Sequence, residues 1–217
     1  QFAQIEQSLS STEQFIEKYQ KQISMIVGGI VTIIALVIGY QKLYIAPMEN
    51  NAQTDMFMAQ LYFEKDSFNL ALNGDGQYLG FLDIIDDYSL TKSGKLASYY
   101  AGLSYLNTGD FENAIDYLKD FSSDDNILSA LALGCIGDAY MELEDTDKAI
   151  SYYKDAADYN DNQFTSPRYI FKRATILEDI GDLDKALSLY KIIKEKYKLS
   201  KQGQDIDKYI SRVENSL

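Results

Sequence analysis

Gly137-Asp138-Ala139-Tyr140, with Ala149 twelve positions after the glycine, is the middle copy of a pattern that occurs three times after residue 100. The other copies are Gly102-Leu103-Ser104-Tyr105 with Ala114, and Ala174-Thr175-Ile176-Leu177 with Ala186. Small residues at two fixed positions let the two helices of a hairpin approach closely, because a larger side chain would push the helices apart. The pattern predicts three consecutive helical hairpins.

Each copy also has an acidic turn between its two small positions, for example Thr108-Gly109-Asp110-Phe111 in the first copy. The small residues, the turn and the period of 35 to 37 residues together resemble the tetratricopeptide repeat (TPR), which has about 34 residues. The resemblance implies an all-α fold, a TPR-type helical-hairpin solenoid over residues 94–217. We expect three repeats at about 94–128, 129–165 and 166–199, followed by a C-terminal helix.

A fourth, degenerate copy precedes these three, with Ala59 and Ala71 again twelve residues apart. Asn73-Gly74-Asp75-Gly76 interrupts its second helix, because two glycines so close together cost roughly 1 kcal/mol each inside a helix. Residues 46–93 are therefore expected to form a degenerate TPR-like hairpin with an inserted loop, then a helix from about Leu79 to Tyr88. A plain turn is favoured over a phosphate-binding loop, since no Gly-Lys-Ser/Thr follows the glycines.

The segment Ile23 to Tyr40 has eighteen residues without a charge, and its apolar character extends to Ile45. This length predicts a single transmembrane helix over residues 23–45, preceded by an arm over residues 1–22 and ended by Pro47. The apolar residues expected to form the membrane anchor are Ile23, Ile26, Val27, Ile30, Ile33, Ile34, Val37 and Ile38. An uncleaved anchor is favoured over a secretory signal peptide, because acidic residues precede the run and no cleavage site follows it.

The lysines around this segment give a weak orientation signal. Lys18 and Lys21 precede the apolar run, and Lys42 follows it. Because cytoplasmic flanks carry an excess of Lys and Arg, the count slightly favours an N-terminus in the cytoplasm.

The net charge of −13 is unevenly distributed along the chain. Residues 55–161 contain 21 acidic and 6 basic residues, a net charge of −15, whereas residues 162–217 contain 8 acidic and 11 basic residues, a net charge of +3. The acidic part would be repelled by nucleic acid, so nucleic-acid binding is not expected. The basic end could meet an acidic partner or lipid headgroups, and a solvated outer face is the simpler interpretation.

The residues that most catalytic and metal sites need are scarce. The sequence has no histidine and a single cysteine, Cys135, which lies in the apolar context of a buried helix. Ser-His-Asp and Cys-His nucleophile systems and His-bearing zinc sites are therefore excluded. The many paired carboxylates, such as Asp86-Asp87, fall at expected helix ends and turns, where Asp caps helices. We expect no enzyme activity and no cofactor.

TPR arrays bind partners on the concave face formed by the first helix of each repeat. Carrying the family pattern over position by position gives a candidate partner groove of fourteen residues. They are Met56, Gln60 and Phe63; Tyr99, Leu103, Leu106 and Asn107; Asp138, Met141 and Glu142; and Arg168, Phe171, Thr175 and Glu178. Only Arg168 and Asn107 match the basic and amide residues of a carboxylate clamp, so that mode is not expected. The mixture of apolar, aromatic and acidic residues suits an amphipathic helix or extended segment of a partner, although any one of them could instead be interior packing.

A second resemblance is carried by segments along the whole chain, beginning with Phe15-Ile16-Glu17-Lys18, the apolar run and Tyr44-Ile45-Ala46-Pro47. It continues through the segment from Tyr62 to Gly76, Phe81-Leu82-Asp83-Ile84-Ile85 and Asp205-Ile206-Asp207-Lys208-Tyr209-Ile210. In these segments the chain resembles the YfgM-like accessory proteins of the bacterial Sec translocon, in their Bacteroidetes form.

This resemblance implies a single-pass protein of the bacterial inner membrane, with a cytoplasmic N-terminus and a periplasmic TPR domain. The implied partners are the SecYEG translocon, a PpiD-like membrane-anchored periplasmic chaperone or isomerase, and client polypeptides. Three other classes remain open. The first is a TPR adaptor of another envelope assembly or secretion complex, and the second is a regulator that sequesters a cytoplasmic factor, which would need the opposite topology. The third and most remote is a membrane-bound enzyme, which turnover lost on mutation of Asp86 or Asp155 would indicate.

Overall fold

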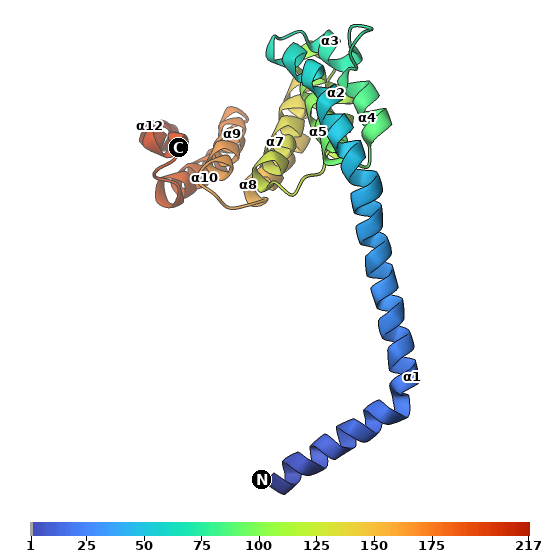
Figure 1. Ribbon diagram of the computed structural model, residues 1–217. Helices are drawn as coiled ribbons and strands as arrows, with labels where there is room; N and C mark the ends of the chain where they lie inside the picture. Colours follow the sequence, from blue (N-terminus) through green and yellow to red (C-terminus); the bar gives the residue numbers. More distant parts are fainter. Residues whose placement is uncertain (1) are drawn as a thin grey trace. The chain divides into compact units, whose positions relative to one another are not determined.

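The computed structural model describes residues 2–217, with side chains from residue 15 onward, and these residues contain helices but no strand (Figure 1). The predicted all-α fold is therefore confirmed. The chain forms two units, Gln1–Met48 and Glu49–Leu217, each with its own internal contacts. The predicted lengths of the arm and of the individual repeats stay predictions.

The N-terminal unit is formed by α1 (Phe2–Tyr40) and a π-helical turn, η1 (Gln41–Ile45). The helical stretch that includes α1 is the one described segment long and apolar enough to cross a membrane, and no protein buries its most apolar window. Of the predicted anchor residues, Ile23 is half-buried and the other seven are exposed, namely Ile26, Val27, Ile30, Ile33, Ile34, Val37 and Ile38. Such a surface needs an apolar environment from outside the chain.

The prediction that the helix ends at Pro47 is wrong. The backbone stays helical through η1, and α2 (Ala46–Glu64) begins one residue before the proline. In η1 the Ala46 N–H donates to the Gln41 carbonyl, five residues earlier. Pro47 therefore lies inside a continuous helix, where its missing N–H leaves one carbonyl of the preceding turn without an intrahelical donor, and the π-helical turn falls in that place.

After α2 the chain forms α3 (Phe68–Asn73), a turn and α4 (Phe81–Tyr88). Asp75 organises the turn: one carboxylate oxygen accepts the N–H groups of Gln77 and Tyr78, and the other accepts the Tyr62 hydroxyl at 2.7 Å. Gly74 adopts φ +73°, and a Cβ there would overlap with the Tyr78 carbonyl. The glycine therefore provides both the left-handed conformation and the close backbone approach that the turn requires.

Three antiparallel hairpins follow, and they share one local design. Their helices are α5 (Lys92–Thr108) with α6 (Phe111–Asp120), α7 (Asn126–Glu142) with α8 (Thr146–Asp158), and α9 (Thr165–Asp179) with α10 (Leu183–Lys196). The second helix of each pair begins after an aspartate that caps it, Asp110, Asp145 or Asp182, by accepting the backbone N–H three residues later. These caps satisfy backbone donors that the helix start leaves free, and they explain the acidic turns of the sequence.

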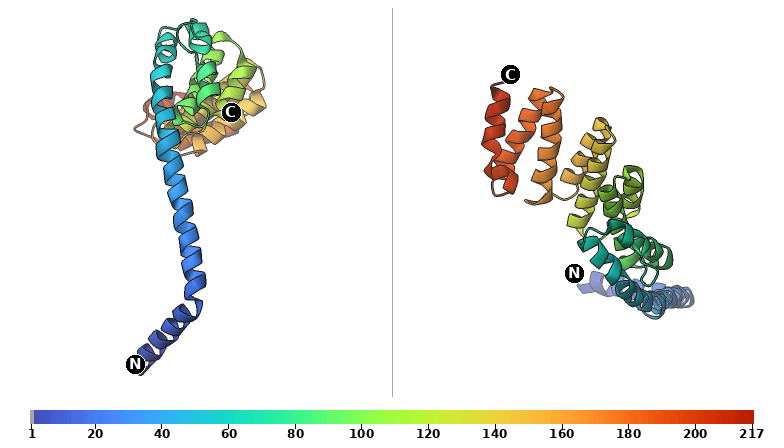
Figure 2. Two further views of the ribbon diagram at one scale, coloured as in Figure 1. Left: turned by 45° about the vertical axis from the view of Figure 1, so that its right-hand side comes forward. Right: turned by 90° about the horizontal axis from the view of Figure 1, so that it is seen from above.

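The small residues of the repeats lie where the two helices of a pair touch. Ala114, Ala149 and Ala186 are completely buried, and a Cβ on Gly102 would press against the Leu118 side chain. The last element, α12 (Ile206–Glu214), follows the short α11 (Lys201–Gln204) and packs on α10, as Figure 2 shows at the red end of the chain. Ile206, Ile210 and Val213 complete the core of the final hairpin.

Candidate partner groove

Helices α5, α7 and α9 are the first helices of the three hairpins, and residues from all three line a cavity of about 630 Å³. Its lining residues are Leu106, Asn107, Gly109, Phe111, Asp138, Met141, Glu142, Tyr153 and Lys172. Five of these belong to the predicted partner groove: Leu106, Asn107, Asp138, Met141 and Glu142. The structure therefore brings together the middle of the predicted set, and we call this space the repeat cavity.

Asp138 is the charged centre of the repeat cavity. Its Oδ1 accepts the Tyr153 hydroxyl from α8 at 2.5 Å and forms an ion pair with Lys172 of α9. The Lys172 Nζ also lies 5.3 Å from the centre of the Tyr153 ring. Burial, followed by the hydrogen bond to Asp138, raises the pKa of Tyr153 well above its usual range, so the phenol stays protonated and donates. The Asp138 carboxylate of α7 thus connects α7 to both α8 and α9.

The rim of the cavity has a different chemistry. Asn107 and Glu142 are exposed, whereas Leu106, Phe111 and Met141 are half-buried and present apolar surface. Because Lys172 compensates Asp138, the carboxylate of Glu142 is the uncompensated charge of the lining. A cavity of this kind suits a polypeptide segment that offers apolar side chains together with a cation or amide donors.

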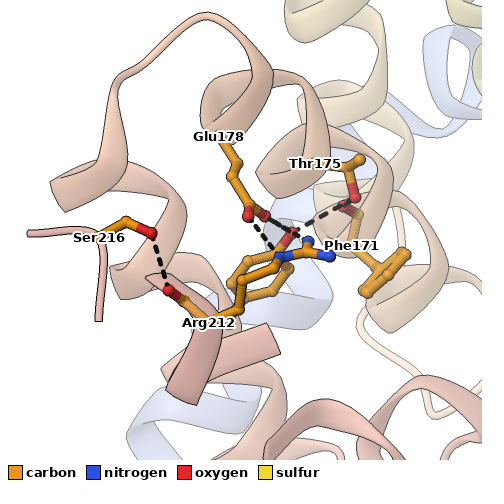
Figure 3. Close-up of polar contacts among 6 residues, drawn as sticks. Phe171, Thr175, Glu178, Arg212 and Ser216 are labelled. Atoms are coloured by element: carbon orange, nitrogen blue, oxygen red, sulfur yellow. Dashed lines mark hydrogen bonds and ion pairs between the residues drawn. The ribbon is translucent and has the colours of Figure 1, made fainter. Parts of the chain in front are cut away.

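The C-terminal part of the predicted groove is covered by the chain's own α12 (Figure 3). The Phe171 ring packs edge-on against Tyr209 with ring centres 4.7 Å apart. Thr175 lies 3.4 Å from the Tyr190 hydroxyl, and that hydroxyl donates to Glu178. Arg212 binds the Glu178 carboxylate through two hydrogen bonds of 2.7 and 2.8 Å. Phe171, Thr175 and Glu178 are therefore occupied by contacts within the chain.

The N-terminal part of the predicted groove is largely interior. Met56 and Tyr99 are buried core residues, and Leu103 packs against the same core cluster as Tyr99. The Phe63 ring lies edge-on to Tyr100 with ring centres 5.2 Å apart. Gln60 lines a separate hollow with Glu49 and Lys92, and Arg168 is exposed beside the Tyr169 ring. These six residues do not belong to the repeat cavity.

Sequence reasoning did not assign the other four lining residues of the cavity, Gly109, Phe111, Tyr153 and Lys172. Lys172 lies 34 positions after Asp138, about one repeat, so the two occupy neighbouring sites on adjacent first helices. Tyr153 lies four residues after the small position Ala149 and points back to the first helix of its own hairpin. The repeat period could have predicted the Lys172 contact, but the inward direction of Tyr153 depends on packing.

The described part of the chain, residues 2–217, contains no cluster of acidic, histidine or cysteine residues arranged to hold a metal ion. The only cysteine of the sequence, Cys135, lies in α7, and burial raises the pKa of its thiol to about 11. The repeat cavity itself offers hydrogen-bonding groups, one ion pair and apolar surface, which are the groups that noncovalent recognition uses.

Family comparisons agree with this geometry. Two tetratricopeptide repeat models match the chain, one over residues 96–124 and the other over residues 132–163. These segments are tetratricopeptide repeats. They contain most of α5 with α6 and most of α7 with α8, the two TPR hairpins that provide most of the lining of the repeat cavity. No curated protein matches the chain at a significant level. TPR proteins are generally noncatalytic scaffolds for protein–protein interaction, and this fold supports that class.

Proposed function

We propose that this chain is a noncatalytic TPR scaffold anchored in the bacterial inner membrane, and that it serves the SecYEG translocon as an accessory subunit. In this proposal it tethers a PpiD-like periplasmic chaperone near the exit site and contacts emerging client polypeptides. The observation that carries the proposal is the repeat cavity, which is open and lined by exposed Asn107 and Glu142 above half-buried Leu106 and Met141.

The apolar segment of α1 supports the anchored part of the proposal. Its side chains from Ile26 to Ile38 are exposed, and its length matches the hydrocarbon thickness of a bilayer. Lys18 and Lys21 before the segment favour a cytoplasmic N-terminus, which would place the TPR domain in the periplasm. Protease added to the periplasmic side of intact cells would then digest the TPR domain and spare the N-terminal arm.

Confinement to one membrane explains how a small cavity could be sufficient. Two partners held in the same bilayer meet at a high effective concentration, so a contact that is weak in solution becomes populated. The cavity offers few strong anchors, since its central ion pair is already satisfied by Lys172. A weak, exchangeable contact is what holding a chaperone or a moving client requires.

The decisive experiment is gentle detergent extraction of the tagged full-length protein, followed by mass spectrometry of the proteins that co-purify. Recovery of SecY together with a PpiD-like isomerase is the expected result. The matched pair of variants is Glu142→Arg in the cavity and Glu112→Arg on α6. Both glutamates are exposed and both substitutions change the charge equally, but only Glu142 lines the cavity.

Loss of the chaperone from the Glu142→Arg sample, with recovery from the Glu112→Arg sample, would support the cavity as the contact surface. Equal recovery of the chaperone from both samples would indicate that it contacts another part of the TPR domain. Reproducible absence of SecY and the isomerase from the wild-type sample, with other envelope machinery enriched, would replace the translocon assignment by the alternative, a TPR adaptor of another envelope assembly or secretion complex.

A further inference from the structure

The loops that join one hairpin to the next lie along one edge of the unit Glu49–Leu217, which we call the loop edge. It comprises residues 89–91, 121–125, 159–164 and 197–200, seen at the lower ends of the solenoid helices in Figure 1. The loop edge begins beside the first residue of the unit. Glu49 accepts a hydrogen bond of 2.7 Å from the Ser93 hydroxyl, at the start of α5.

Contacts run along this edge from one loop to the next. Lys92 pairs with Asp124 at 3.1 Å, which links the first loop to the second. The second and third loops share a cavity lined by Ser123 and Tyr159. The third and fourth are joined by the Tyr197 hydroxyl, which donates to Asp161 at 2.6 Å. The loop edge is therefore a continuous surface that extends from Glu49 to the end of α10.

The C-terminal end of the loop edge exposes large apolar side chains next to cations. Phe164 is 61% exposed and Leu199 is 86% exposed, the largest value among the exposed hydrophobic residues of the described chain. Lys198 and Lys201 flank Leu199, and Arg168 lies one turn after Phe164. Lys198, Lys201 and Arg168 form no salt bridge with any side chain that the structure describes. The Gln163 amide donates to the Lys196 carbonyl at 3.1 Å and holds the two loops together.

We propose that this patch, formed by Phe164, Lys198, Leu199 and Lys201, contacts the surface of a bilayer that contains anionic lipid. Exposed apolar side chains next to lysines are the chemistry of a peripheral lipid contact, because the apolar tips enter the headgroup region while the cations are attracted to the anionic headgroups. The patch would give the protein a second attachment to the membrane. This inference rests on the anchored topology of the proposed function.

Chain connectivity keeps the unit Glu49–Leu217 tethered close to the bilayer in the proposed topology. Glu49 follows Ile45, the last residue of the expected span, by four residues, and four residues reach at most about 15 Å even when fully extended.

Charge confines the contact to the C-terminal end of the edge. The second loop carries Asp124 and Asp125, and residues 55–161 have a net charge of −15, so this part is repelled by anionic lipid. Residues 162–217 have a net charge of +3. Asp161, the acidic residue beside the patch, is already paired with Lys196 at 2.6 Å. The basic end of the sequence thus coincides with the exposed apolar tips.

The test uses the absence of tryptophan from the sequence. A Leu199→Trp variant of the full chain is reconstituted in nanodiscs of phosphatidylcholine with phosphatidylglycerol, and the emission is compared with and without bromine on the lipid acyl chains. Trp at position 199 is expected to emit at shorter wavelength and to lose most of its emission to the brominated lipid. The matched control is Ile180→Trp, since Ile180 is 60% exposed in a turn at the opposite ends of the helices.

The electrostatic part is tested by adding Lys198→Glu and Lys201→Glu to the Leu199→Trp variant, which is expected to remove most of the quenching. Quenching no stronger at position 199 than at position 180 would overturn the proposal, as would equal quenching in phosphatidylcholine alone. Incorporation of the protein into the nanodisc reports on the α1 anchor independently. A failed anchor and a failed patch are therefore distinguishable.

Discussion

The ring of Tyr169 in α9 lies directly on the backbone of Gly134 in α7. A Cβ on Gly134 would overlap with the Cε1 and Cζ atoms of the ring, and Tyr169 is only 1% exposed. One turn later, Gly137 receives the Tyr153 ring from α8 in the same way. The two rings are nearly parallel, with centres 6.0 Å apart. Gly134 and Gly137 therefore determine how closely α9 and α8 approach α7.

Gly134→Ala is expected to lower the free energy of unfolding by about 1–3 kcal/mol, although alanine is the better helix former, because the buried Tyr169 ring has no space to retreat. Thermal unfolding of the purified full chain, followed by circular dichroism, measures the effect. Ser151→Ala on the exposed face of α8 is the control and should change little. A Gly134→Ala protein as stable as wild type would show that α7 and α9 can move apart without a loss in the free energy of unfolding.

Arg212→Ala is expected to cost about 1–2 kcal/mol, because it leaves the largely buried Glu178 carboxylate with fewer donors. The Glu178 side chain is 15% exposed and that of Arg212 is 54% exposed, so solvent reduces but does not remove the effect. Lys191→Ala, which breaks an exposed pair with Glu214, is the control and should cost less than about 0.5 kcal/mol. Equal losses in the two variants would contradict the special role of the α9–α12 pair.

The same pair predicts a pH dependence. The hydrogen bonds from Arg212, and then that from Tyr190, hold the pKa of Glu178 below its ordinary value of 4.5 despite its burial. A lowered folded-state pKa means that the stabilisation is present above the ordinary value and is lost as the pH falls through the folded-state value. The free energy of unfolding of wild type should therefore exceed that of Glu178→Gln above pH 4.5, and this difference should shrink as the pH falls below 4.5. A constant difference in stability between the two proteins across this range would disprove the linkage.

Glu144→Gly is expected to raise the stability. Glu144 adopts φ +59° at the turn between α7 and α8, whereas the equivalent turns have Gly109 at φ +83° and Gly181 at φ +85°. A side chain in this region is strained by roughly 1–2 kcal/mol, and glycine also has a greater entropic cost of folding, so the net gain should be about 0.5–1 kcal/mol. Denaturant titration measures it, and the converse change Gly109→Glu should destabilise.

Cys135 should be a reporter of unfolding. Its pKa of about 11, raised mainly by burial, leaves at pH 8 a thiolate fraction about 100-fold smaller than an ordinary thiol has. Alkylation of the folded protein at pH 8 should therefore be slow, and it should become fast in denaturant. Rapid labelling under native conditions would indicate that α7 opens locally.

The sequence predicted the fold because its determinants are local. Small residues at Gly102, Gly137 and Ala174, each with an alanine twelve positions later, require helices that touch, and the aspartates between them cap the second helices. Pro47 was the exception, because a π-helical turn lets the helix continue through a residue that usually ends one.

The binding surface could be predicted only in part. Helical periodicity identified which residues lie on the first helices, and Asn107, Asp138 and Glu142 do meet in one cavity. Periodicity does not say which of these positions another element covers. Met56 and Tyr99 are buried by neighbouring helices, and Phe171 and Glu178 are taken by α12.

The sequence by itself determined the helical hairpins, their capped turns and one exposed apolar helix, because spacing along a helix fixes which residues share a face and how long an apolar run is. Only the tertiary structure decided that Tyr153 and Lys172 converge on Asp138, and that α12 closes one end of the groove. These contacts join residues 15 to 34 positions apart, and they depend on how separate helices pack rather than on the order of residues within any one of them.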